Sequence, residues 1–236
     1  MSDSPNLSLP LLMPSQAQKH VTVNEALLRL DSAVNLVLRS IDLVTPPEAA
    51  PDGVAFGVPE GAVNAWADCG GKIALGQGGG WVFIQPSRGW RAFVEDRGAE
   101  AIHDGAAWQV GAATLTPKGA GIRMMSDELL HTVVAGNVNS VGWTPSGPVM
   151  MLGVTARVTE ALSGGLTSWS LGWAGAPDQF GSGLGTGQDS WCRGLISTPT
   201  TIWNPEPLIL TAHGGAFAAG AIRIAIHYID LMLPTG

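Results

Sequence analysis

Two tryptophans near carboxylates and amides are the residues of this chain best suited to bind a ligand. The residues concerned flank or lie within a glycine-rich segment, and they are Trp173, Asp178, Gln179, Asp189 and Trp191. An indole ring packs on the apolar face of a sugar, while carboxylates and amides accept hydrogen bonds from sugar hydroxyls. Because loops at the end of a β-sandwich commonly carry binding groups, these five residues are predicted to contact a glycan. The alternative is that both tryptophans pack in the core or between subunits.

Catalysis is not predicted from the carboxylates. Cleavage of a polysaccharide needs two carboxyl groups about 5–10 Å apart. The candidates form no recognisable motif, and they are Glu160, Asp178, Asp189, Glu206 and Asp230. The five histidines lack metal-ligand spacing, and the glycine runs are not followed by the Gly-Lys-Ser/Thr of a phosphate-binding loop. We therefore expect no catalytic residue, no metal and no cofactor.

The composition indicates a protein that shares much of its surface with other subunits. Only 13% of the residues are charged and 45% are hydrophobic, whereas the usual charged share is about 25%. Such a surface suits a subunit of an assembly. The alternative is a tightly folded β-protein with a surface of Ser, Thr and Gly. The 32 glycines and 16 prolines favour many turns and short strands.

Charge and hydropathy argue against several partners. The net charge of −7 and the lack of a basic stripe argue against nucleic acid. No apolar run reaches the roughly 18 residues that a membrane-spanning helix needs, so membrane insertion is not expected. No basic segment precedes an apolar run at the N-terminus, so synthesis in the cytoplasm without a secretory signal is expected. Cys69 and Cys192 are accordingly expected to be reduced thiols.

The predicted fold class is mainly β, and the chain divides into four predicted parts. These are a docking arm with a short helix (1–44), a small β-module (45–112), a connector (113–147) and a β-sandwich or jelly-roll tip (148–236). The arm itself, residues 1–21, is predicted to be extended because Pro5, Pro10 and Pro14 disfavour a helix.

A helix is predicted after the arm. It would begin at the capping box formed by Thr22 and Glu25 and end near Arg39. Its apolar residues recur at helical spacing, at Leu27, Leu30, Val34 and Val37. An isolated helix of about four turns is marginal in water, so this face must pack on something. Two partners remain open: identical helices in a parallel bundle, or the downstream domain of the same chain.

Short strands separated by glycine-containing turns are predicted in the β-module. They are Val54–Val58, Ala62–Ala67, Lys72–Leu75, Trp81–Ile84, Trp90–Val94 and Ala107–Val110. The large side chains predicted to form the core of this module are Trp66, Trp81, Trp90 and Trp108.

The tip is also predicted to be β. Its expected strands are Val149–Val158, Ser168–Trp173, Leu208–Thr211 and Ala221–Leu233, with a glycine-rich loop over Gly175–Gly187. In the last strand, one face is predicted to hold Ile222, Ile224, Ile226, Tyr228 and Asp230. Upstream of the tip, Ser126–Val134 is compatible with either a helix or a strand.

Three stretches resemble a known family. The most specific is Ser15-Gln16-Ala17-Gln18-Lys19-His20, which continues to Leu27 and follows Leu9-Pro10-Leu11-Leu12. The other two run from Gly61 to Trp66 with Trp81–Ile84, and from Gly89-Trp90 through Phe93-Val94 to Asp104-Gly105 and Trp108. Together, over about residues 9–110, they resemble a domain of unknown function found in fibre proteins of prophages and gene transfer agents. Ala221–Leu233 is more loosely similar to receptor-binding tips of phage fibres.

The resemblance implies a head-spike or fibre subunit on the surface of a phage-like particle, which adheres to host capsule polysaccharide. It assigns no catalytic residues. An extended arm can add to the sheet edge of a particle-base, capsid or tail protein. The residues predicted to dock in this way are Leu9, Leu11, Gln16, Gln18, Lys19 and His20, which otherwise form a solvated lead-in to the helix.

The expected oligomer is a homotrimer, since three identical helices or strands wrap compactly around an axis. A pentamer is the alternative if the subunit matches a capsid vertex. Two other functions compete with host attachment: a purely structural connector in a head or tail assembly, and a polysaccharide-cleaving hydrolase.

Overall fold

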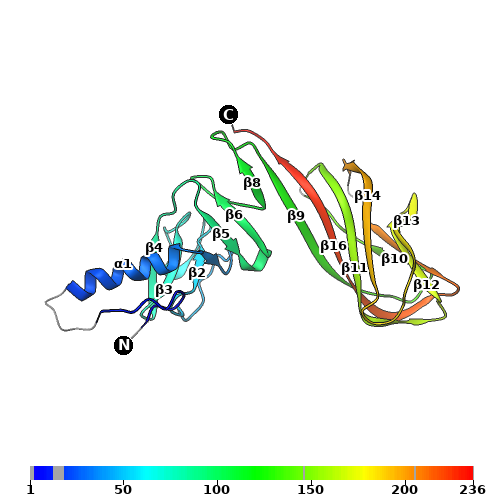
Figure 1. The fold of residues 1–236 in the computed structure, drawn as a ribbon, viewed down its shortest axis with the longest axis horizontal. Coiled ribbons are helices and arrows are strands. Elements are labelled where there is room, and N and C mark those ends of the chain that lie inside the picture. The colour runs from blue at the N-terminus through cyan, green and yellow to red at the C-terminus, as the bar shows by residue number, and fades with distance from the viewer. Residues whose placement is uncertain (1–2, 13–18, 146, 205, 236) are drawn as a thin grey trace. The chain divides into compact units, whose positions relative to one another are not determined.

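The computed structural model describes residues 3–12, 19–145, 147–204 and 206–235, and it confirms the mainly β fold (Figure 1). The chain forms two compact units, Met1–Gly119 and Ala120–Gly236, and each has a hydrophobic core of its own. Within the described ranges, no helix is both long enough and apolar enough to cross a membrane.

The first unit is built on a seven-stranded sheet with the order β4-β3-β2-β1-β5-β6-β7. Its strands are β1 (Val37–Leu38), β2 (Ala55–Gly57), β3 (Ile73–Gln77), β4 (Gly80–Ile84), β5 (Arg91–Val94), β6 (Ala99–His103) and β7 (Trp108–Val110). The short elements of this unit are the 3-10 helices η1 (Asn64–Trp66) and η2 (Glu95–Arg97) and the strand β8 (Ala112–Leu115). Strand β1 pairs in parallel with β2 and β5, and the other neighbours are antiparallel.

One predicted strand of this unit is wrong, and three observed strands, β1, β6 and β8, were not predicted. The segment Ala62–Ala67 contains η1 instead of a strand, because Asn64 has a φ of 55° that an extended chain does not allow. Strand β6 escaped prediction because Ala and Glu, which make up most of its sequence, are depleted in strands.

Aromatic side chains fill the core of the first unit, as predicted. Trp66 is 0% exposed, and its ring centroid lies 5.3 Å from that of Phe56 and 5.2 Å from that of Trp81. Trp90 and Trp108 are half-buried and pack against a second cluster of apolar residues. The four tryptophans of this unit therefore pack in or against its hydrophobic core.

Helix α1 (Lys19–Ala33) ends earlier than predicted. Asn35 has a φ of 54°, which is the left-handed conformation that commonly terminates a helix. The chain then enters β1, where Val37 pairs with β5. The prediction of an end near Arg39 was wrong because the apolar period runs through this turn into the strand. The predicted start at Thr22 was also wrong, because the helix already begins at Lys19.

The second unit is a sandwich of antiparallel sheets. One sheet has the order β10-β15-β12-β13, and the other contains β14-β11-β16-β9 in that order. The strands are β9 (Gly121–Thr132), β10 (Val138–Val141), β11 (Val149–Gly164), β12 (Ser168–Trp173), β13 (Ala176–Leu184), β14 (Trp191–Ile202), β15 (Leu208–His213) and β16 (Phe217–Met232). The three long strands β9, β16 and β11 run side by side (Figure 1).

The two sheets face each other across one core. Ile222, Ile224 and Ile226 of β16 are each 0% exposed, and they belong to one cluster with Trp169 and Leu210 of the other sheet. The inward face predicted for this strand is therefore confirmed.

The segment 113–147, predicted to be a connector, consists largely of strands. It contains β9, which also decides the ambiguous segment Ser126–Val134 in favour of a strand, and β10. Along β9, half-buried and exposed residues alternate. Trp143, after β10, is 6% exposed and donates its indole N–H to the Asp127 carboxylate at 2.7 Å. Long-range pairing with β16 holds β9 in place, and the sequence of β9 by itself does not reveal that partner.

Candidate functional site

The glycine-rich segment before Trp191 is a strand and not the loop predicted over Gly175–Gly187. Strand β13 covers most of that segment and pairs with β12. A Cβ atom at Gly181 would lie 3.1 Å from the sulfur of Cys192, so glycine lets the strand pass close to the core. The prediction of a loop failed because Gly181 is needed for close packing of the strand against Cys192 and does not form a turn.

The five residues predicted to contact a glycan are dispersed over the second unit. Trp173 ends β12 and lines one hollow, while Trp191 begins β14 and lines another. Asp189 lies just before β14 and forms an ion pair beside the second hollow. Asp178 and Gln179 are exposed on β13 and belong to neither set of lining residues. The structure therefore does not bring the five together in one patch.

The first hollow, here the tryptophan hollow, has a volume of about 350 Å³. Its lining residues are Trp173, Gly175, Ala176, Thr201, Ile202, Trp203, Asn204 and Glu206. The ring of Trp173 is held by Phe180, at 5.1 Å between centroids. Trp203 is 73% exposed. An open indole face beside the Asn204 amide and the Glu206 carboxylate can pack on a sugar ring and bind its hydroxyls.

The second hollow, here the arginine face, has a volume of about 580 Å³ and lies on the sheet that contains β14-β11-β16-β9. Its lining residues are Glu128, Thr155, Ala156, Arg157, Trp191, Cys192, Arg193, Arg223 and Ala225. Strand alternation turns its long side chains away from the core. On β11, for example, Val158 is 0% exposed, whereas the adjacent Arg157 is exposed.

The strand register arranges the arginine face in rows. Arg157 stands opposite Trp191 of β14 and also opposite Arg223 of β16. Arg193 follows two positions after Trp191 on the same side of β14 and stands opposite Thr155. Three guanidinium groups from distant parts of the sequence thus come together on three adjacent strands.

Two carboxylates flank these arginines. Asp189 Oδ1 lies 3.5 Å from Arg157 Nη1, and Glu128 Oε1 lies 3.5 Å from Arg223 Nη1. All four side chains are more than half exposed, so each pair contributes only about 0–1 kcal/mol to stability. The guanidinium groups keep donors that face solvent and can bind another anion.

Asp189 owes its place beside Arg157 to a tight turn. Its φ is 67°, and its backbone N–H donates to the carbonyl of Val158 at 2.9 Å. Asp tolerates this left-handed conformation better than most residues. The turn leads directly into Trp191 and so fixes one edge of the arginine face.

The arginine face was not predicted from the sequence. Arg157, Arg193 and Arg223 each stand next to buried residues in strands of period two, which indicates that they point outward. The sequence does not show which strands are neighbours, so the cluster itself was not apparent. The exposure of Trp203 was likewise not predicted from the sequence.

The N-terminal arm turns back on itself, so the prediction of an extended arm was wrong. Asp3 and Pro10 form a β-bridge, and the Ser4 N–H donates to the carbonyl of Leu9 at 2.9 Å. Ser8 adopts a φ of 54° within this reversal. Prolines exclude a helix here, as predicted, but they do not prevent a turn.

The arm is tied to helix α1 by the carboxylate of Asp31, which is 1% exposed. This carboxylate accepts the hydroxyl of Ser4 and the backbone N–H groups of Asn6, at 3.0 Å, and Leu7, at 2.6 Å. Burial alone raises the pKa of Asp31, but these hydrogen bonds together lower its pKa below the ordinary value. Asp31 is therefore an ionised structural anchor.

The residues predicted to dock on the particle are only partly described. Leu9 and Leu11 are half-buried in the arm, and Lys19 and His20 begin α1. Gln16 and Gln18 lie outside the described residues. Docking itself stays a prediction.

Helix α1 and the turn directly after it expose an apolar stripe, here the α1 stripe, that consists of Val23, Leu27, Leu30 and Val34. Val23, Leu30 and Val34 are 41%, 55% and 46% exposed, and Leu27 is half-buried. The spacing of four, three and four residues is that of the contact line of a coiled coil. Packing on the same unit, one of the two possibilities left open for this helix, leaves most of the stripe exposed.

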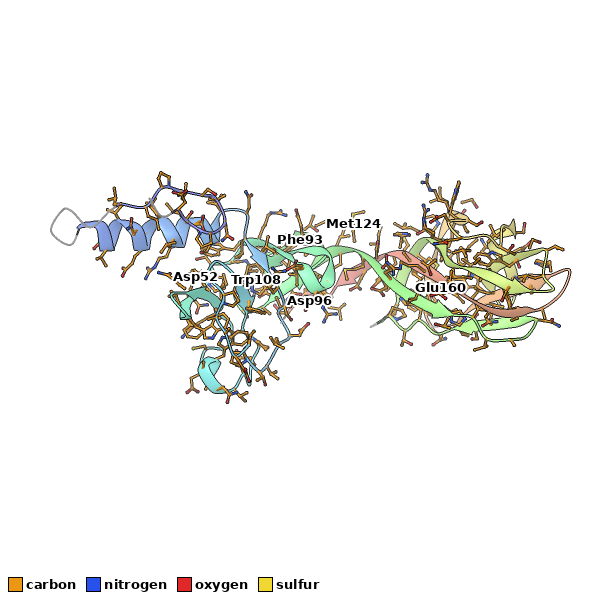
Figure 2. The ribbon with its side chains drawn as sticks, turned by 90° about the horizontal axis from the view of Figure 1, so that it is seen from below. Asp52, Phe93, Asp96, Trp108, Met124 and Glu160 are labelled. Atoms are coloured by element: carbon orange, nitrogen blue, oxygen red, sulfur yellow. The ribbon has the colours of Figure 1, made fainter. Side chains whose placement is uncertain are left out.

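The carboxylates considered for cleavage are scattered over the second unit. Glu160 is exposed on β11 (Figure 2), and Asp230 forms an ion pair with Arg123 at 3.4 Å. Asp189 belongs to the arginine face and Glu206 to the tryptophan hollow. In the part of the chain that the structure describes, no three His, Cys, Asp or Glu side chains are grouped to hold a metal ion.

A family model matches part of the first unit. Residues 23–109, less than half of the chain, match a family described as "Protein of unknown function (DUF2793)". No curated protein was found with significant similarity to the chain.

One of the solved structures that match is titled "Cyanophage Pam1 capsid asymmetric unit". The matching chain has 22% identity and a TM-score of 0.31, over 52% of this chain and 92% of that one. At this TM-score the match does not establish a shared fold.

Proposed function

We propose that this chain is a fibre or spike subunit of a phage-like particle, and that its second unit binds polysaccharide on the surface of the host cell. The tryptophan hollow carries this proposal. Trp203 offers an open indole face next to an amide and a carboxylate, and Trp173 completes the wall. Aromatic faces beside hydrogen-bonding groups are the combination that a sugar ring requires.

Assembly of the subunit is supported by the α1 stripe. Apolar side chains at coiled-coil spacing are stable in water when copies of the helix cover one another. A homotrimer is therefore proposed, with the first unit joined to a particle-base, capsid or tail protein. The subunit would be made in the bacterial cytoplasm and reside on the particle surface.

Attachment to cells tests the proposal. Labelled full-length chain should adhere to encapsulated host cells and not to cells that lack the capsule. Trp203→Ala should weaken adhesion by about tenfold or more, because an exposed aromatic anchor typically contributes 1–3 kcal/mol. Phe93→Ala, which removes a 42% exposed aromatic from the first unit, is the matched control and should leave adhesion unchanged.

The purely structural connector is the second candidate, and the exposed α1 stripe also favours it. A connector would be found in particles and would assemble through α1. It would, however, adhere equally poorly to cells with and without capsule. That result would replace host attachment with the connector function.

Binding without cleavage is proposed, since the carboxylates considered for cleavage lie in different places. Incubation of capsule polysaccharide with the full chain should release no reducing sugar. Release above that of a heated control would instead establish the hydrolase.

A further inference from the structure

We infer that the arginine face is an acidic-glycan site, on which Arg157, Arg193 and Arg223 bind sugar carboxylates while Trp191 packs on a sugar ring. This inference deepens the proposed function and rests on it for the identity of the ligand as a glycan. It adds a second binding surface and a chemical class of sugar that the tryptophan hollow does not specify.

The first support is an unfavourable pairing in the sheet. Arg157 and Arg223 stand directly opposite each other on β11 and β16. Like charges at such positions destabilise a sheet. The ion pairs with Asp189 and Glu128 offset this repulsion only in part, because all four side chains are largely exposed to solvent. The repulsion is relieved when an anion lies between the two guanidinium groups.

The second support is the concentration of positive charge. Residues 120–236 contain four arginines and no lysine, in a chain with a net charge of −7. Three of the four lie on the arginine face. The fourth, Arg123, pairs with Asp230 and is less exposed than the others. Positive charge in the second unit is therefore gathered at one surface.

The flanking carboxylates orient the arginines without saturating them. Asp189 and Glu128 each hold one guanidinium group at 3.5 Å. Arg193 has no carboxylate within ion-pair distance among the residues that the structure describes. A guanidinium group presents five donors in a planar fork that matches the two oxygens of a carboxylate.

Trp191 indicates that the carboxylate of the ligand belongs to a sugar. It is 64% exposed and stands opposite Arg157, so an indole and a guanidinium group lie side by side on the surface. The hollow is lined by residues of β9, β11, β14 and β16, which suits a polymer that lies across the sheet. A single-stranded nucleic acid also presents a row of anions together with stacking bases, so it is the competing ligand in the test.

Binding to a polyuronate tests the inference. The probes are alginate, neutral dextran and a single-stranded oligonucleotide, each titrated against the full chain. Alginate should bind and dextran should not. Binding should weaken strongly between about 50 and 200 mM salt, because exposed charge pairs are screened. Equal binding of dextran, tighter binding of the oligonucleotide, or no binding of alginate would overturn the inference.

Substitutions then locate the site. The double variant Arg157→Gln/Arg223→Gln should bind alginate about tenfold or more weakly, because two charge-assisted hydrogen-bonding groups are lost. It should fold normally, since the two ion pairs that are lost along with the repulsion are exposed and contribute little to stability. Arg91→Gln, which alters an exposed arginine of the first unit that pairs with Glu100 at 3.8 Å, is the matched control. Alginate binding that survives in the folded double variant would contradict the inference.

The same variants separate this inference from the proposed function. If the double variant adheres to encapsulated cells like the unaltered chain while Trp203→Ala does not, host attachment stands and the arginine face is not its site. If the unaltered chain adheres to no cells but binds alginate through the arginines, the site stands and the proposed function fails.

Discussion

The carboxylate of Asp31 on helix α1 accepts the backbone N–H of Leu7 in the N-terminal arm at 2.6 Å. The same side chain also accepts the N–H of Asn6 and the hydroxyl of Ser4. One buried anion therefore satisfies three donors of the turn. We therefore expect the conformation of the arm to depend on the ionisation of Asp31.

Stability should depend on pH through Asp31. Its pKa in the folded chain is lowered, so its contribution is complete above the unfolded pKa of about 3.9 and disappears as pH falls through the lower folded pKa. Asp31→Asn should reduce the free energy of unfolding by about 1–3 kcal/mol at pH 7. The difference between the two proteins should shrink below about pH 4, as measured by urea unfolding.

Asp96→Asn is the matched control for Asp31, because Asp96 is exposed in η2. It should change the unfolding free energy by less than about 0.5 kcal/mol. A deficit in Asp31→Asn that stays constant down to low pH would show that Asp31 does not anchor the arm as a carboxylate.

Assembly should depend on Leu30. This side chain is 55% exposed in the α1 stripe, and a charge in a coiled-coil contact line opposes association. Leu30→Glu should therefore shift the full chain from trimer to monomer in light scattering coupled to size exclusion, with little change in the unfolding of the second unit.

Arg29→Glu introduces the same side chain at an exposed position next to the α1 stripe. It should leave the oligomer intact. An unaltered chain that is already monomeric at high concentration, or a Leu30→Glu variant that remains trimeric, would exclude α1 as the assembly element.

The tryptophans of the second unit should fall into two classes on substitution. Trp169 is 0% exposed and donates its indole N–H to the carbonyl of Gly185 at 2.9 Å. Trp169→Ala should cost about 3–5 kcal/mol of unfolding free energy. Trp203→Ala should cost less than about 1 kcal/mol, because its side chain is largely exposed. Thermal unfolding of both variants checks this contrast, and a large loss for Trp203→Ala would identify it as a packing residue.

Close packing beneath the arginine face should make Gly194 intolerant of a side chain. A Cβ atom there would lie 2.4 Å from the carbonyl oxygen of Phe180. Gly194→Ala should destabilise the second unit by about 1–3 kcal/mol and displace the start of β14, which carries Trp191. Gly142→Ala has no atom within 4 Å of its added Cβ and should be neutral by chemical denaturation. Equal stability of the two variants would contradict the close approach of β13 and β14.

Local sequence determined much of the fold because strand periodicity and core hydrophobicity act over short distances. The alternation in Ala221–Leu233 indicated which face of β16 is buried, and the four tryptophans of the first unit indicated its aromatic core. The family match over 23–109 lies within the stretch of the resemblance, about residues 9–110, but it does not confirm a fibre or spike family.

Tertiary structure decided which residues meet. Strand order and register depend on contacts between distant segments, and no local pattern records them. Pairing of β11 with both β14 and β16 places Arg157 beside Trp191 and Arg223. Pairing of β13 with β12 turned an expected loop into a strand and separated Trp173 from Trp191. The arm, likewise, folds back because Asp31, over twenty residues away, accepts its backbone donors.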